Sequence, residues 1–192
     1  MLLHNQTQAI QRMNTLAKEG KDFFFIINYR ADSAYIEEFT NIDPRELLFS
    51  FPTLSNIPEA ESYSSEAVEW HTEPPTREDY EHRINLVKQR EREGDSYLAN
   101  LTCKIPIRTN LSLHDIFMRS KALYRCWMKE KFVCFSPEIF VRINREGLIS
   151  SFPMKGTIDA TRPDAEKELM ENKKEAAEHA TIVDLIRNDL SM

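Results

Sequence analysis

The chain has 192 residues, of which 41% are hydrophobic and 29% charged, and its formal net charge is −6. This length and composition predict a globular protein with one sizeable core, or a large domain with an appendage. The acidic balance argues against nucleic-acid binding, because no stripe of arginine and lysine interleaved with aromatics offsets it.

The sequence carries no sign of a targeting segment or of a transition-metal site. The opening MLLHNQTQAIQ turns polar after three residues, and the run FFFII is too short to cross a bilayer. We therefore expect a cytoplasmic protein without a membrane partner. Its three cysteines and five histidines lack disulfide-framework and zinc spacings. Dinucleotide, P-loop and serine-hydrolase motifs are missing as well.

The first third of the chain predicts a small α/β region. A helix is expected over residues 6–19, ended by a glycine, and three short strands follow it. The strands are DFFFIINY, SAYIEEF and ELLFSF. Residues 52–75 are rich in Pro, Ser and Glu, which is typical of a long irregular connection. We therefore place a domain boundary between residues 1–75 and residues 76–192.

The middle of the chain predicts alternating helices and strands. Residues 76–93 indicate a charged amphipathic helix that ends at a glycine and packs by one face. Residues 94–109 favour a strand, and residues 110–124 favour a second helix capped by Asn110 or Ser112. Further strands are predicted at FVCF, IFVRI and GLISSF.

The last segment predicts one long helix. Thr161 or Arg162 is expected to cap it, with Pro163 in the first turn and acidic residues at the positive end of the helix dipole. Apolar residues surround the later turns, so we expect these turns to be buried on most sides. The chain stops inside this helix, and we therefore expect the N-terminal portion of a longer protein.

Four segments occur together in a characteristic order, namely GDSYLANLT, FSPEIFVRI, SFPMKGT and KKEAAEHATIVDLIRNDL. Over residues 78–192 they resemble the chorismate-utilising enzymes, most closely aminodeoxychorismate synthase component I, also called para-aminobenzoate synthase component I. The resemblance implies an α+β fold of antiparallel sheets flanked by helices. This fold would be part of a two-lobed β-sandwich that is incomplete at the C-terminus. Residues 76–192 would then be the N-terminal part of the chorismate-binding catalytic domain.

The resemblance implies that Lys155 is the catalytic nucleophile. It lies in the run PMKGT, at a position where anthranilate synthases have a small residue. The base lysine of isochorismate and salicylate synthases corresponds to Leu98. Lys155 would attack C2 of chorismate as the C4 hydroxyl leaves, and ammonia would resolve the adduct to 4-amino-4-deoxychorismate. A free lysine has a pKa of about 10.4, so burial or a nearby cation must favour its neutral form.

Four further residues correspond to the family's site. Glu138 matches the catalytic acid and base, Gly156 and Thr157 match substrate-binding positions, and Glu178 matches a ligand of Mg²⁺, the expected cofactor. Each carboxylate also has a simpler interpretation. Glu138 suits a surface position in a tight turn, and Glu178 suits an i, i+4 ion pair with Lys174.

Other family positions imply less chemistry. Glu171 and Glu175 lie near the helix face of the expected ligand, and His179 is interpreted as a packed or capping residue and not as a ligand. The segment 187–189, Arg-Asn-Asp, is expected to bond the helix to neighbouring strands, and Asp184 has no assigned role. On local sequence alone, Lys155 itself is an exposed lysine at a strand end.

Three departures from the family pattern limit the expected activity. Ile-Asp-Ala replaces the usual Arg-Pro-Arg at residues 158–160, and the shortened segment before Ser136 predicts no regulation by tryptophan. The second magnesium-binding glutamate and the carboxylate-binding residues of the family would lie beyond residue 192. We therefore expect an impaired chain.

The expected whole enzyme takes ammonia from a separate glutamine amidotransferase subunit and serves folate synthesis. Two alternatives remain open at this point. One is anthranilate synthase component I, against which Lys155 argues. The other is a non-catalytic fragment or interaction module, which exposed sheet edges would favour.

Overall fold

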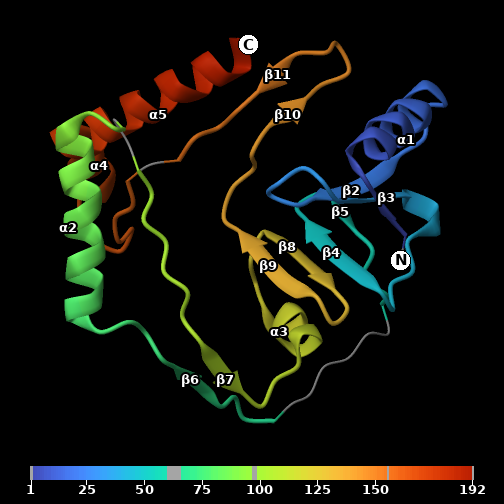
Figure 1. Cartoon of the computed structure of the whole chain (residues 1–192), viewed down its shortest axis with the longest axis horizontal. Coiled ribbons are helices and arrows are strands. Elements are labelled where there is room, and N and C mark those ends of the chain that lie inside the picture. The colour runs from blue at the N-terminus through green and yellow to red at the C-terminus, as the bar shows by residue number, and fades with distance from the viewer. Residues whose placement is uncertain (1, 60–65, 97–98, 155, 192) are drawn as a thin grey trace. The chain divides into compact units, whose positions relative to one another are not determined.

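The structure is a computed structural model that describes residues 2–59, 66–96, 99–154 and 156–191 (Figure 1). It is a mixed α/β fold, and each strand pairing among these residues is antiparallel. The described residues of 1–61 and 120–192 form one compact unit, and those of 62–119 form another. The expected domain boundary after residue 75 stays a prediction.

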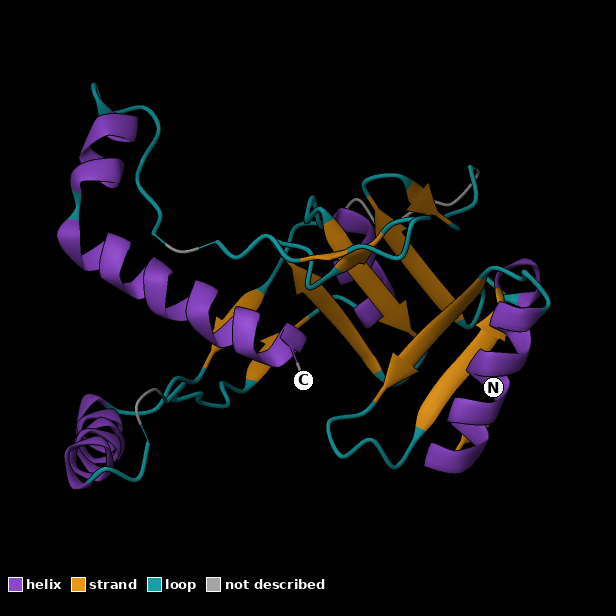
Figure 2. Cartoon of the chain, turned by 90° about the horizontal axis from the view of Figure 1, so that it is seen from above, coloured by secondary structure: helices purple, strands orange, loops and turns teal. Residues whose placement is uncertain are grey.

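The first sheet has the strand order β1-β3-β2 and is covered by a helix on one face. Its strands are β1 (Leu3–His4), β2 (Phe23–Ile27) and β3 (Ala34–Glu38), and the helix is α1 (Gln6–Lys18). Asn5 and Gln8 cap α1 reciprocally, each side chain accepting a hydrogen bond from the other residue's backbone N–H. Ala9 and Leu16 then pack α1 onto β3, and Figure 2 shows this helix alongside strands near the N-terminus. The predicted helix and both predicted strands are confirmed here.

The second sheet joins distant parts of the sequence in the order β5-β4-β8-β9. Its strands are β4 (Leu47–Phe51), β5 (Leu54–Ser55), β8 (Tyr124–Met128) and β9 (Phe132–Ser136). The short 3₁₀ helix η1 (Phe39–Asn41) precedes β4. The prediction that a helix runs to Tyr124 is wrong, since Tyr124 begins β8. The pairing of β8 with β4 decides this segment, and helical periodicity cannot reveal a partner so far away in sequence.

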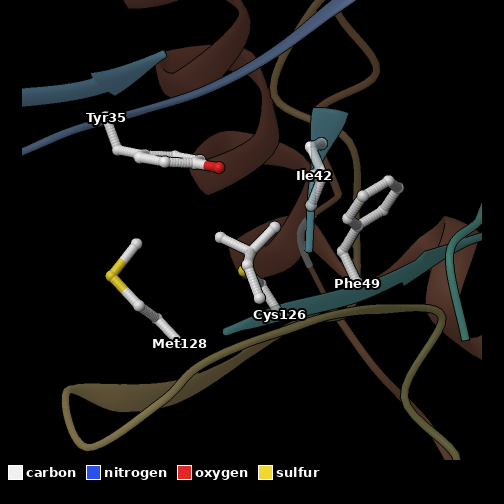
Figure 3. Packing of buried hydrophobic residues seen from close by; sticks show 6 residues of the cluster. Tyr35, Ile42, Phe49, Cys126 and Met128 are labelled. Atoms are coloured by element: carbon white, nitrogen blue, oxygen red, sulfur yellow. The ribbon is translucent and has the colours of Figure 1, made fainter. Parts of the chain in front are cut away.

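The core of this unit lies between the two sheets. Side chains of β3 alternate, so that Tyr35 faces the second sheet while its neighbours Ala34 and Ile36 face α1. Phe24 of β2 stacks on Phe49 of β4 with ring centroids 4.6 Å apart. Figure 3 shows Tyr35 and Phe49 in the same cluster as Ile42, Cys126 and Met128. This apolar packing holds the second sheet in place, and the chain continues from its last strand, β9, to the C-terminal residues of the unit.

A hairpin and two helices follow β9. They are β10 (Arg142–Ile143), β11 (Ile149–Ser150), α4 (Ala165–Glu171) and α5 (Lys173–Ser191). The predicted single helix is divided at Asn172, whose side chain accepts hydrogen bonds from the N–H groups of Lys174 and Glu175 at 3.0 and 3.2 Å. This local capping bond competes with helix continuation.

Two expectations about these helices are wrong. Asp164 precedes α4 in a left-handed conformation, so the helix starts after the predicted caps Thr161 and Arg162. No described residue of α5 is buried, although its later turns were expected to be covered. An apolar stripe indicates which face of a helix favours burial, but it does not indicate whether this chain supplies the residues that cover that face.

The second unit consists of a two-stranded ribbon and two helices. They are β6 (Trp70–Thr72), α2 (Arg77–Glu93), β7 (Ile107–Thr109) and α3 (Leu113–Arg119). Both ends of α2 are as predicted, with Thr76 as the N-cap and Gly94 in a left-handed conformation. None of its described residues is buried, however, so the expected packing of its apolar face is not seen.

The ribbon revises two sequence predictions. Of the expected strand over residues 94–109, only residues 107–109 form one, while residues 97–98, and with them Leu98, lie outside the described residues. The expected irregular connection contains β6, and Asn110 holds its start by accepting from Glu69 N–H and donating to the Ala67 carbonyl. Ser112 accepts a hydrogen bond from Asp115 N–H at 3.0 Å, as a helix cap does.

Candidate active site

Glu138, which follows the end of β9, is held by the Ser136 side chain and by one backbone N–H. The Ser136 hydroxyl donates to the Glu138 carbonyl at 2.8 Å and accepts from the Glu138 N–H at 3.4 Å, which forms a tight turn. The exposed carboxylate of Glu138 then accepts a hydrogen bond from the backbone N–H of Met154 at 3.1 Å. Glu138 therefore lies in the turn that the simpler interpretation predicts, and it also contacts the residue that precedes Lys155.

Lys155 lies outside the described residues, whereas its neighbours in the sequence, Met154 and Gly156, are described. On one side, Met154 bonds to Glu138. On the other, Gly156 approaches α4 and α5 closely: a Cβ added to Gly156 would lie 2.9 Å from Oε2 of Glu175 in α5 and 3.1 Å from Cδ1 of Leu169 in α4. The described neighbours of Lys155 in the sequence thus contact Glu138 on one side and Leu169 and Glu175 on the other.

Gly156 meets two conditions that favour glycine. Its φ angle of +77° lies in the left-handed region, where a Cβ is unfavourable, and the space that a Cβ would take is already filled by side chains of α4 and α5. Thr157 follows as an exposed residue. Of the two expected substrate-binding residues, only Gly156 therefore packs against α4 and α5.

Glu178 lies one turn further along α5 and is exposed. Its Oε1 is 3.4 Å from Nζ of Lys174, so the ion pair anticipated as the simpler interpretation is present. Lys174 also lies 4.0 Å from Glu175. Exposed helix pairs of this kind contribute little to stability, and a competing cation can displace the lysine.

The carboxylate oxygens of Glu178 are compatible with Mg²⁺, but they are few. Magnesium prefers oxygen ligands and commonly uses one or two carboxylates, completing its shell with substrate oxygens and water. Glu178 supplies one such carboxylate, and Glu175 lies one turn earlier on the same helix. Within the described part of the chain, no group of three or more His, Cys, Asp or Glu side chains converges. The described residues therefore fit a site with one protein carboxylate at its base.

Open hollows lie on both sides of the segment 151–153. One, of about 410 Å³, is lined by the turn at the end of β9 and by α5, and it contains Glu138, Ser136 and Met154. The other, of about 480 Å³, is lined by later residues of α5 together with His179. Ser151, Pro153 and Ile186 border both. His179 thus lines a hollow next to the one that contains Glu138.

The signature residues near the end of α5 bond within the helix. Arg187 Nη2 lies 2.6 Å from Oδ1 of Asp184, and the Ser191 hydroxyl donates to the Asn188 carbonyl. Asp184, which had no assigned role, is therefore the partner of Arg187. The expectation that this segment bonds to neighbouring strands remains a prediction.

Two contributors to the site were not singled out by the sequence. Ser136 fixes the turn of Glu138, and the Met154 N–H holds its carboxylate. The Ser-Pro-Glu order was a signal for the first, because serine commonly bonds the backbone two residues on. A backbone donor has no signal in the residue type, so the second could not be found.

Comparison with known proteins gives a consistent set of matches. The family described as chorismate binding enzyme matches residues 33–192. The chain is 38% identical over 182 residues to a protein of Pasteurella multocida and 40% identical over 183 residues to one of Haemophilus influenzae, both named uncharacterized PabA-like protein. These alignments cover 95% of the chain but 56% and 55% of the relatives. The chain thus spans about half the length of these curated relatives.

Other relatives match a shorter part. A probable chloroplastic aminodeoxychorismate synthase of Oryza sativa is 34% identical over 114 residues, which is 52% of this chain and 13% of that protein. Proteins named anthranilate synthase component 1 match as well. No solved structure matches the chain significantly. In the part of the chain that the structure describes, no helix combines the length and apolar character needed to cross a membrane.

Proposed function

The chain belongs to the family of chorismate-binding enzymes, and we propose that it aminates chorismate to 4-amino-4-deoxychorismate. The observation that carries this proposal is the hydrogen bond from the Met154 N–H to the Glu138 carboxylate at 3.1 Å. Met154 is the residue that precedes Lys155 in the sequence, so this bond supports a role for Glu138 as the acid and base of the reaction. Lys155 itself supports amination at C4 over anthranilate formation, because a nucleophilic amine is available at that position.

Each residue has one role in the proposed reaction. The neutral amine of Lys155 bonds to C2 of chorismate while Glu138 protonates the C4 hydroxyl, which leaves as water. Ammonia then bonds to C4, and the bond between Lys155 and C2 breaks. Gly156 would contact the substrate through its backbone groups, because the position of a Cβ is taken by Glu175 and Leu169, and the Thr157 hydroxyl would offer the substrate a hydrogen bond.

Glu178 would hold Mg²⁺, which supplies positive charge for a carboxylate of the dianionic substrate. The acidic chain has a net charge of −6, so such a counter-charge favours binding of an anion. Ammonia would come from a glutamine amidotransferase subunit, and the product would enter para-aminobenzoate and folate synthesis. These partners belong to the proposed whole enzyme.

Two other functions have observations in their favour. Relatives named anthranilate synthase component 1 also match the chain, so anthranilate is the competing product. A non-catalytic module is the second, because apolar side chains stay exposed on the C-terminal hairpin and helices. They include Phe140, Ile143, Leu148 and Met170.

Product analysis separates these functions. The chain, and an extended form that adds the remaining C-terminal residues of the Haemophilus influenzae relative, would be incubated with chorismate, an ammonium salt and Mg²⁺, and the products separated by chromatography. We expect 4-amino-4-deoxychorismate from the extended form and weak or no turnover from the 192-residue chain. Fluorescent anthranilate would instead support the competing enzyme. If neither form bound or converted chorismate, the enzyme proposal would be overturned.

A further inference from the structure

Two cysteines lie directly opposite each other in the second sheet. Cys126 of β8 pairs in register with Cys134 of β9, which are the two strands of one hairpin. Side chains of directly opposite residues point to the same face of a sheet, with Cα atoms about 4.5 to 5.5 Å apart. Disulfides require Cα separations of about 4.4 to 6.8 Å. The backbone therefore already holds these thiols at disulfide spacing.

The two thiols differ in access. Cys126 is 7% exposed and belongs to the core cluster between the sheets (Figure 3), whereas Cys134 is exposed on β9, the edge strand. Both line a cavity of about 230 Å³ whose walls include Phe24, Phe51 and Tyr124. A small reagent can therefore reach Cys134 first, because the neighbouring thiol of Cys126 is buried.

Hydrogen bonding gives the exposed cysteine the character of a nucleophile. The Cys126 thiol donates to the Cys134 sulfur, and this bond, with a further one from the Cys126 N–H, lowers the pKa of Cys134 to about 7 although burial opposes it. The same bond and burial raise the pKa of Cys126. The thiolate is the reactive form of cysteine, so Cys134 is the attacking thiol and Cys126 the resolving one.

We propose that Cys126 and Cys134 form a reversible dithiol–disulfide site that reacts with low-molecular-weight disulfides. The Cys134 thiolate attacks one sulfur of the small disulfide, forms a mixed disulfide and releases one small thiolate. Cys126 then loses its proton and attacks the sulfur of Cys134, which releases the second small thiol. Two protein thiols are oxidised, and one small disulfide is reduced to two thiols.

The location indicates a switch rather than a structural staple. The bond would close only the short loop from residue 126 to residue 134, so it constrains the unfolded chain weakly. An excess of small thiol should therefore reverse it. Cys134 also lies two residues before Ser136, whose hydroxyl fixes the turn of Glu138. Oxidation of Cys134 would thus occur near the end of β9, close in sequence to Glu138, the candidate acid.

Peptide mapping tests this proposal in the whole chain. The reduced protein is incubated with oxidised glutathione, remaining thiols are blocked with N-ethylmaleimide, and the trypsin digest is analysed by mass spectrometry. We expect residues 126–129 and 132–142 to appear as one disulfide-linked pair, and dithiothreitol to separate them. We also expect Cys134 to react roughly threefold faster than a thiol of ordinary pKa. The half-buried Cys103 is the internal reference.

Variants identify the order of attack. Cys126→Ser should leave a stable glutathione adduct on Cys134, and Cys134→Ser should leave Cys126 unmodified. Cys103→Ser is the matched control, since it leaves the core and the pair untouched and should form the linked peptides as the wild type does. A stable adduct on Cys134 without a linked peptide in this control would overturn the proposal, and so would a rate at Cys134 no higher than at Cys103.

Discussion

Glu138 and Gly156 are placed by contacts that involve the backbone. The carboxylate of Glu138 is fixed by the N–H of Met154, and the backbone of Gly156 is pressed against the side chain of Glu175. The sequence predicted both residues as site candidates through the family pattern. It could not predict their contacts, because these depend on how β9, the segment 151–157 and α5 meet in space.

Replacing Glu138 by glutamine tests its role as an acid. The amide oxygen of Glu138→Gln can still accept the Met154 hydrogen bond, so the turn should be kept, but the amide cannot protonate the leaving hydroxyl. In the extended form we expect kcat to fall by about 10² to 10⁴, with KM for chorismate little changed. Glu171→Gln is the control, because Glu171 is an exposed carboxylate of α4. A kcat within twofold of wild type, measured by product formation, would remove Glu138 from the mechanism.

Gly156→Ala tests the close approach to α5. The new methyl group meets a left-handed backbone and two side-chain contacts of 3.1 Å or less. We expect the free energy of unfolding, measured in urea, to fall by about 1–2 kcal/mol or more. Gly147→Ala is the matched control, since Gly147 has a φ of +79° but nothing within 4 Å of an added Cβ. Equal losses in the two variants would show that crowding at Gly156 is unimportant.

At the scale of elements, local signals predicted some helices and strands well and others poorly. The caps at Asn5, Thr76 and Gly94 are local, so α1 and α2 end close to the predicted positions. β8 was missed because its strand character comes from pairing with β4, far away in sequence. The division at Asn172 was missed because asparagine also occurs inside helices, and only its capping bonds reveal the break.

The outer edge of β4 depends on one side chain. Asn56 accepts from the Phe49 N–H at 2.8 Å and donates to the Leu47 carbonyl at 2.9 Å, so its amide acts as a short extension of β5. We expect Asn56→Ala to lower the free energy of unfolding by about 1–3 kcal/mol, because it leaves two strand groups without this partner. Asn14→Ala, on the exposed side of α1, should change it by less than about 0.5 kcal/mol. Similar unfolding midpoints for both variants would contradict this role.

Asp43, which precedes β4, makes a pH-dependent contribution to the stability of the fold. The side chain of Arg45 bonds to Asp43, with Nη2 2.7 Å from Oδ2, and together with the Arg45 N–H it lowers the pKa of Asp43 to about 2. The unfolded value is about 3.9, so this contribution is present above that pH and is lost as the pH falls through the folded value. The Tm difference between wild type and Asp43→Asn should thus shrink between about pH 4 and pH 2. A difference that stays constant over this range would refute the link.

At the scale of the whole molecule, family membership was predictable and the compact units were not. Four segments in a fixed order were enough to predict the family, which the match over residues 33–192 confirms. The first unit, however, combines residues before 62 with residues after 119. Such a combination follows from strand pairing between distant segments, which composition and periodicity do not report. Residues 52–75 looked like a boundary by their composition, and the chain returns after them to the second sheet, where β8 pairs with β4.

The exposed apolar residues of α5 also belong to this scale. Val183, Leu185 and Leu190 are each about two-fifths exposed. The sequence predicted their apolar pattern correctly, and the burial predicted with it was wrong. The apolar pattern depends only on the sequence of the helix, whereas burial also depends on which other residues pack against it.

The most direct test of the central claim is the turnover of Lys155→Ala. Chorismate amination would be compared in the extended form with and without this substitution, with Lys167→Ala, an exposed lysine of α4, as the control. We predict that Lys155→Ala loses at least about a thousandfold in kcat while Lys167→Ala stays at the wild-type rate. Undiminished formation of 4-amino-4-deoxychorismate by Lys155→Ala would contradict the claim that this lysine forms the carbon–nitrogen bond.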